Sequence, residues 1–211
     1  MWVFPGALNV LDSGYATLDT LFITAPWVFL FLVPAVTMRS FSEEKKTGTI
    51  ELILTRPITD TQLILGKLLA ALVLIIILLV PVLIYFVSVY ALGNPVGNID
   101  TGGTWGSFIG LMCLALAYAA IGIFTSSTTD NQIVAFIMAV VICLLAYSGI
   151  AMIGQLEIFS PLQYFLTSIS IEEHYSSMSR GVIDTRDLIY FIAICAMFVV
   201  ATKTILESRK W

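Results

Sequence analysis

Charge is scarce in this sequence. Only 11% of its 211 residues are Asp, Glu, Lys or Arg, whereas 59% are hydrophobic and the mean hydropathy is +0.98. A soluble domain carries about 25% charged residues. Because so few charges cannot cover a water-facing surface, the composition excludes a soluble domain and indicates a polytopic membrane protein.

A disulfide framework and intramembrane charges are also absent. The three cysteines, Cys113, Cys143 and Cys195, lie inside apolar runs, and we interpret them as small packing residues. The centres of the apolar runs contain no Asp, Glu, Lys, Arg or His, while Asp19 and Lys203 lie at their ends. Ion-coupled transport and intramembrane proteolysis both need such groups, so their absence argues against a secondary antiporter and against an aspartyl or metalloprotease.

Nucleotide-binding and catalytic motifs are absent as well. Gly66-Lys67 lacks the upstream glycine and the following Ser or Thr of a phosphate-binding loop. The single histidine, His174, follows two glutamates and could be half of a metal site. An isolated cluster of this kind on a loop is more often solvated, and we interpret His174 in this way. We therefore expect neither enzyme activity nor a cofactor or metal bound by this chain.

What the sequence does contain is a set of five apolar segments. A bilayer core about 30 Å thick needs roughly 20 apolar helical residues. The segments that qualify are 18–38, 68–91, 105–124, 133–153 and 188–205. The predicted fold is an all-α membrane protein with one transmembrane domain over 1–211, a polar region at 39–67 and an outer loop at 154–187.

Positive charges are distributed unevenly between the two sides. Segment 39–67 has five Lys or Arg residues and the tail has three, whereas the other side has only Arg180 and Arg186. The positive-inside rule places 39–67 and the C-terminus in the cytoplasm, and residue 1 outside. Since no signal peptide precedes it, an outward start indicates that a first span is missing from this chain; a five-span protein is the alternative.

The polar region predicts a short helix between two marked boundaries. Thr47-Gly48 is expected to end a helix at 40–46, and the capping-box spacing from Thr59 to Gln62 predicts a new helix from about residue 60. Residues 49–55 lie between these boundaries.

Residues 49–55 have the pattern of an amphipathic helix. Ile50, Ile53 and Leu54 fall on one face and Glu51 on another. Such a helix suits docking into a groove of a cytoplasmic partner, and it equally suits a surface helix that only connects two spans. Periodicity alone does not separate these readings.

Two further patterns predict packing surfaces. A stripe of small residues in the third span favours close helix contact within the subunit or across a dimer, with a substrate groove as the alternative. The stripe consists of Gly106, Gly110, Cys113, Ala117 and Ala120. After Pro161, an apolar face predicts a helix in the outer membrane interface. Its residues are Leu162, Phe165, Leu166 and Ile169.

One stretch carries a family resemblance. Glu44-Lys45-Lys46-Thr47-Gly48-Thr49-Ile50-Glu51-Leu52, followed by Pro57 and Gly66-Lys67, resembles the signature of ABC-2 type transporter permeases. Residues 181–184, before the last span, also look like this family. Within this family, the amino-acid sequence of residues 42–60 is most similar to that of gliding-motility-associated permeases. Permeases for copper-site maturation are the second choice.

The resemblance implies the remaining expectations. It implies six spans per subunit, a coupling helix at 49–55 in a groove of a cytoplasmic ABC ATPase, and a second permease subunit, identical or not. ATP and Mg would bind the ATPase, and the location would be the bacterial inner membrane, with lipid but no nucleic acid as a further partner. The docking residues would be Glu44, Lys45, Gly48, Thr49, Ile50, Glu51, Ile53, Leu54 and Pro57.

The leading functional hypothesis is thus an ATP-driven export permease linked to gliding motility or associated secretion. A non-transporting membrane anchor that recruits a cytoplasmic ATPase or assembly is the alternative from a different class, and a membrane-embedded enzyme has no catalytic constellation to support it.

Overall fold

The computed structural model describes residues 18–54, 57–93, 96–97, 99–155, 161, 163–181 and 184–208, and for 52–54 it describes the backbone alone. The described residues are almost entirely helical and contain no strand. In chain order the elements are α2 (Asp19–Thr37), α3 (Arg39–Lys46), α4 (Thr49–Leu54), α5 (Asp60–Leu92), α6 (Thr101–Thr128), α7 (Gln132–Leu144), the π-helix η1 (Leu145–Gly149), α8 (Ile150–Gly154), α9 (Gln163–Ile169), α10 (Ile171–Ser179) and α11 (Thr185–Ser208).

Five helical segments in the described part are long and apolar enough to cross a membrane. They are Asp19–Lys46, Asp60–Leu92, Thr101–Thr128, Gln132–Gly154 and Thr185–Ser208. Each overlaps one of the five spans expected from hydropathy, so the prediction of an all-α polytopic membrane fold is confirmed. The expected first span upstream concerns chain outside the described residues and stays a prediction.

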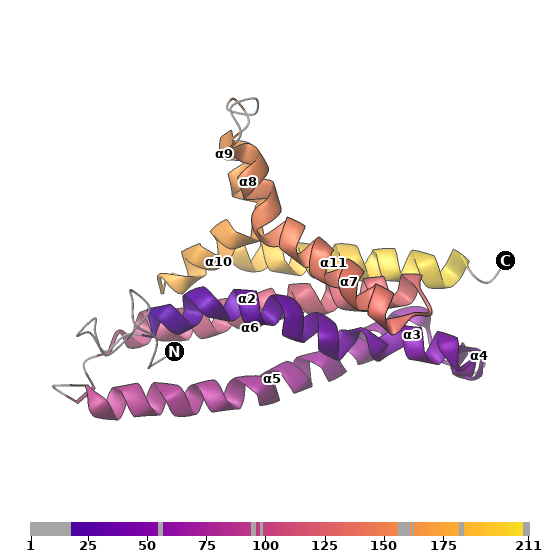
Figure 1. Cartoon of the computed structure of the whole chain (residues 1–211), viewed down its shortest axis with the longest axis horizontal. Coiled ribbons are helices and arrows are strands. Elements are labelled where there is room, and N and C mark those ends of the chain that lie inside the picture. The colour runs from indigo at the N-terminus through magenta and orange to yellow at the C-terminus, as the bar shows by residue number, and fades with distance from the viewer. Residues whose placement is uncertain are drawn as a thin grey trace.

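Helix α6 is the centre of the bundle. It contacts α2, α5, α7, α10 and α11 (Figure 1). In its most apolar stretch 72% of the residues are buried, against 17% for α5 and 11% for α11. Any movement of α6 must therefore change the packing of every other long helix. Few residues of α5 and α11 are fully buried, so both helices also present apolar side chains to lipid or to another subunit.

Local sequence signals explain several helix boundaries. Thr59 accepts a hydrogen bond from the amide of Gln62, and the Gln62 side chain accepts one from the amide of Thr59. This reciprocal pair confirms the predicted capping box that starts α5. Gly48 has φ +71°, a left-handed conformation that glycine adopts without strain, and it separates α3 from α4 as expected.

The fourth apolar segment does not continue as one straight helix. Residues Leu145–Gly149 form a π-helical turn, and π-turns commonly produce kinks in long helices. Beyond it, α8 packs against α9, and the pair projects sideways from the bundle in Figure 1. We call this α8–α9 pair the spur.

The spur exposes large apolar side chains. Tyr164 is 84% exposed and Phe165 60% exposed, and both lie on α9. The expected interfacial helix thus corresponds to α9, in which Leu166 and Ile169 are partly exposed; Leu162 lies outside the described residues. Leu166 also approaches Gly154 of α8 closely, which closes the hairpin.

Helix α10 is the main departure from the sequence prediction, which left this stretch in a loop. Ile171, Tyr175 and Met178 form a buried stripe against α6. The prediction that His174 is solvated is wrong, because its side chain is buried between α10 and α11. The helical spacing of these three apolar residues could be recognised in the sequence. The charges of Glu172 and Glu173 nevertheless favoured a loop interpretation.

Candidate functional site

The predicted docking helix lies at one end of the bundle. Figure 1 shows α3, α4 and the C-terminal end of α11 together at this end. A small core joins them: Phe41 of α3, Ile64 of α5, Ile123 of α6 and Leu206 of α11 pack together. Segments that are far apart in sequence therefore meet beneath α4. We call this cluster of Phe41, Ile64, Ile123 and Leu206 the platform.

A serine of α6 holds the junction between α2 and α3. Ser126 Oγ accepts hydrogen bonds from the amides of Phe41 and Ser42, at 2.9 and 3.0 Å, and donates one to the carbonyl of Met38, at 2.7 Å. A hydroxyl has one proton and two lone pairs, so its capacity is used fully. Because the first amides of a helix lack partners within that helix, Ser126 caps α3 from a neighbouring helix.

A close backbone approach reinforces this junction. A Cβ atom on Gly122 would lie 1.9 Å from Thr37 Oγ1, so only glycine fits there. Gly122 and Ser126 are four residues apart and lie on one face of α6, one turn from each other. Lys45 of α3 also donates a hydrogen bond to the carbonyl of Ser127. Residues of α6 therefore contact the α2–α3 junction over more than one helical turn.

Lys67 connects the start of α5 to the same platform. Its ammonium group forms an ion pair of 2.5 Å with Glu44, donates a hydrogen bond to the carbonyl of Ser40, and lies 4.5 Å from the centre of the Phe41 ring. All three contacts favour a cation at this position. The resemblance singled out Lys67 and Glu44, and the structure pairs them.

Helix α4 has one side toward the platform and one side open. Ile50 is half-buried and packs against the platform core, whereas Thr49, Glu51 and Pro57 are exposed. The side chains of Ile53 and Leu54 lie outside the described residues, so the expected apolar docking face stays a prediction. Gly48 is exposed, and Glu44 and Lys45 are partly buried by the contacts described above.

The small-residue stripe lies on the far half of α6. Gly106 and Gly110 face α10, where a Cβ on Gly106 would approach the carbonyl of Met178 to 2.7 Å. Ala117 and Ala120 are buried in the bundle and Cys113 is partly buried. The close helix approach in this structure lies within the subunit, between α6 and α10.

Sequence reasoning missed the residues that position the site. Ser126 lies in a run of Thr and Ser that was interpreted as a connecting loop, and its partners are 84 to 88 residues away. No local pattern identifies such a contact. The sequence does place several hydroxyl residues at the end of a long apolar helix, and this pattern could have indicated a polar contact there.

Comparison with known proteins decides the family. The family described as "ABC-2 family transporter protein" matches residues 13–210, nearly the whole chain. The chain belongs to the ABC-2 transporter family. A search of curated proteins returns no match for this ABC-2 protein.

Membership fixes the general role. ABC-2 permeases are transmembrane subunits without a catalytic site, and they work with an ABC ATPase. The resemblance assigns residues 49–55 to that partner, and α4 covers Thr49–Leu54 of this segment.

Proposed function

We propose that this chain is the permease subunit of an ATP-driven exporter and that its ATPase docks on α4. The observation that carries the proposal is the attachment of α4 to the centre of the bundle. Ile50 packs on the platform, and the preceding α3 is capped by Ser126 of α6. A force on α4 is therefore delivered to the helix that contacts all the other long helices.

The mechanism follows from these contacts. Closure of the ATPase displaces α4, and α3 moves with it because Thr49 of α4 is hydrogen-bonded to Thr47 and to the carbonyl of Glu44. Lys67 and Ser126 join α3 to α5 and α6, so the movement reaches both of these helices. The displacement shifts α6 against α2 at the tight Gly122–Thr37 contact. A partner that binds one arrangement of the bundle more strongly than the other by a few kcal/mol is enough to change which arrangement dominates.

The proposed orientation places the α4 end in the cytoplasm. Arg39, Lys45, Lys46 and Lys67 lie at this end, together with Lys203 near the end of α11. This asymmetry supports a cytoplasmic C-terminus in a bacterial inner membrane. We further propose an association with gliding motility or its secretion system, which is supported by the resemblance of the amino-acid sequence of residues 42–60.

Affinity purification of the tagged chain from membranes of its own host tests the docking. The wild-type chain is expected to bring down an ABC ATPase, detected by ATP hydrolysis and mass spectrometry. Glu51→Lys on the exposed side of α4 should reduce recovery of the ATPase at least tenfold, because it reverses a charge inside the contact.

The matched control reverses a charge at the other end. Glu173→Lys lies on an exposed position of α10 and should leave ATPase recovery unchanged. Equal recovery with the wild type and Glu51→Lys, or equal loss with both variants, would remove α4 as the docking element. Labelling of single cysteines at positions 51 and 173 with an impermeant maleimide on intact cells reports the orientation; only position 173 should react.

A further inference from the structure

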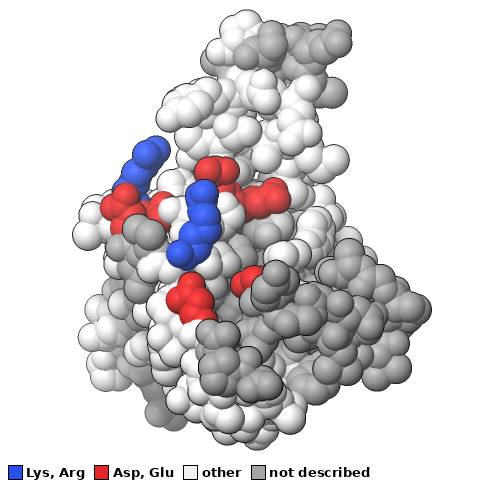
Figure 2. Space-filling view, turned by 90° about the vertical axis from the view of Figure 1, so that its left-hand side faces the viewer, with Lys and Arg blue, Asp and Glu red and all other residues white. Residues whose placement is uncertain are grey.

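A cavity opens at the end of the bundle opposite α4. It has a volume of about 730 Å³ and is walled by α2, α6, η1 and α10. This is within the range of about 300–1,000 Å³ that is typical of small-molecule sites. Figure 2 looks onto this end and shows acidic and basic side chains gathered on it, beneath the apolar spur.

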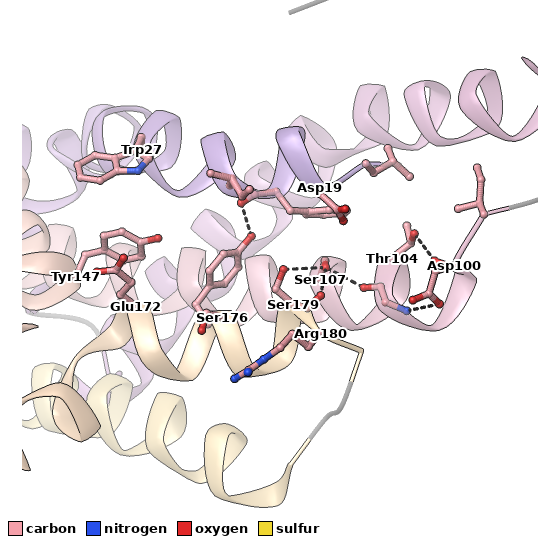
Figure 3. A pocket seen from close by; sticks show the side chains of 16 residues that line it. Asp19, Trp27, Asp100, Thr104, Ser107, Tyr147, Glu172, Ser176, Ser179 and Arg180 are labelled. Atoms are coloured by element: carbon pink, nitrogen blue, oxygen red, sulfur yellow. Dashed lines mark hydrogen bonds between the residues drawn. The ribbon is translucent and has the colours of Figure 1, made fainter. Parts of the chain in front are cut away.

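One side of the cavity combines aromatic rings with a carboxylate. Trp27 of α2 and Tyr147 of η1 pack edge to face, with ring centroids 5.6 Å apart. Glu172 of α10 lies beside Tyr147 in Figure 3. Trp27 is 45% exposed, so part of its side chain is open to a ligand. Aromatic faces next to a carboxylate attract cations, and Trp does so most strongly.

The charges of the wall also favour a cation. Asp19, Asp100 and Glu172 line the cavity against a single cation, Arg180, which gives a net charge of −2 from three negative charges and one positive. Asp100 caps α6 by accepting from the amide of Gly103. Within the described part of the chain, no hydrogen bond or ion pair joins Glu172 to another residue, so its carboxylate is available to a ligand.

Several other polar groups of the wall already have hydrogen-bond partners. Tyr175 donates its hydroxyl proton to the carbonyl of Phe22 at 2.8 Å, and burial raises the pKa of Tyr175, so this ring stays neutral. Ser107 donates to the carbonyl of Gly103 and contacts Ser179. Figure 3 shows these serines and Arg180 toward the opposite side from Trp27 and Tyr147. On the side of the cavity away from these serines, the groups that can meet a cation are the two rings and Glu172.

We propose that this cavity binds organic cations bearing an alkylated ammonium group, held between Glu172 and the rings of Trp27 and Tyr147. The ammonium gains an ionic partner on one side and ring faces on the other, and the remaining volume accepts the uncharged part of the ligand. The site is separate from the α4 platform, and binding to it does not require the ATPase.

Calorimetry on the full chain in maltoside detergent tests the proposal. The probe is choline, and its control is 3,3-dimethylbutan-1-ol, which has the same shape without the charge. Choline should bind saturably and at least about tenfold more tightly than the neutral alcohol, since loss of the charge removes both the ionic and the cation–π attraction. Equal heats from the two compounds overturn the proposal without any mutation.

Variants then locate the site. Trp27→Ala and Glu172→Gln should each weaken choline binding about tenfold. The matched controls are Trp105→Ala and Glu173→Gln, which change an exposed tryptophan and an exposed glutamate that do not line the cavity. Both controls should bind choline as the wild type does. Weakening by the control variants as large as that by the cavity variants also overturns the proposal.

A final experiment distinguishes two ligands that carry the same alkylated ammonium group, a lipid headgroup and a free compound. The chain is placed in nanodiscs of phosphatidylglycerol alone or mixed with phosphatidylcholine, and choline binding is measured in each. Competition by phosphatidylcholine assigns the site to a lipid headgroup, and undiminished binding assigns it to a free ammonium compound. Because the ATPase is absent from these experiments, a failure here does not bear on the docking of α4.

Discussion

The Ser126 hydroxyl donates a hydrogen bond to the Met38 carbonyl across the interface between α6 and the α2–α3 junction, over 2.7 Å. The same oxygen accepts the amide protons of the first turn of α3. This contact ties the α2–α3 junction to the central helix by three hydrogen bonds at one atom.

Ser126→Ala should destabilise the protein. The substitution leaves two buried amides and a carbonyl without this partner, at a cost of about 1–3 kcal/mol for each group that stays unsatisfied. Unfolding in detergent measures the stability. Thr125→Ala is the control, because Thr125 is equally buried but its hydroxyl bonds to Gly122 within α6. Similar losses in both variants would contradict a special role for Ser126.

Gly122→Ala should destabilise the bundle through a steric clash. The added methyl group meets Thr37 Oγ1, and overpacking of this kind typically costs about 1–3 kcal/mol. Thr37→Ala in the same chain should recover part of the loss, because the nearest remaining atom, Cβ, lies 3.0 Å away. Gly66→Ala is the control: no atom lies within 4 Å of its added Cβ, and the helix should gain stability.

His174→Ala should destabilise the end of the bundle at α10. His174 Nδ1 lies 2.7 Å from Asp187 Oδ1, its Nε2 lies 3.0 Å from the carbonyl of Ser168, and its ring stacks on Tyr190. Removing the imidazole leaves the buried Asp187 carboxylate and the Ser168 carbonyl without this partner, at a cost of about 1–3 kcal/mol for each group that stays unsatisfied. The double variant with Asp187→Ala should lose less than the sum of the single losses, and strict additivity in detergent unfolding would contradict the pairing.

Reversing the Lys67–Glu44 pair should restore only part of the stability that Lys67→Glu removes. Lys67→Glu places a negative charge against Glu44, the Ser40 carbonyl and the Phe41 ring. Adding Glu44→Lys repairs the ion pair, but the carbonyl and the ring still favour a cation at position 67. The midpoint of thermal unfolding for the double variant should therefore lie between those of Lys67→Glu and the wild type. Full recovery would show that the ion pair alone matters.

The sequence predicted what depends on composition and local pattern. Hydropathy located all five apolar helices, because a membrane imposes a minimum length of apolar residues. The capping box at Thr59 and the glycine break at Gly48 were predictable because their partners are within three residues. These boundaries define α4, so the position of the candidate docking helix could be deduced before its surroundings were known.

Contacts between distant residues could not be predicted in this way. The partners of Ser126 and the burial of His174 depend on which helices become neighbours, and that information is not local. The cavity likewise needs Trp27, Tyr147 and Glu172 from three different elements. No periodicity in a single segment brings these residues together.

The π-turn after α7 has a consequence for the surrounding bilayer. The 13 residues of α7 rise only about 20 Å at 1.5 Å per residue, which is less than the roughly 30 Å of a hydrocarbon core. The π-turn and α8 complete the crossing, because Gln132–Gly154 as a whole is long and apolar enough to span a membrane, so the kink lies inside this span. Because the spur projects from the bundle (Figure 1) and exposes Tyr164 and Phe165, the subunit presents a broader apolar outline to its surroundings there than a straight fourth helix would.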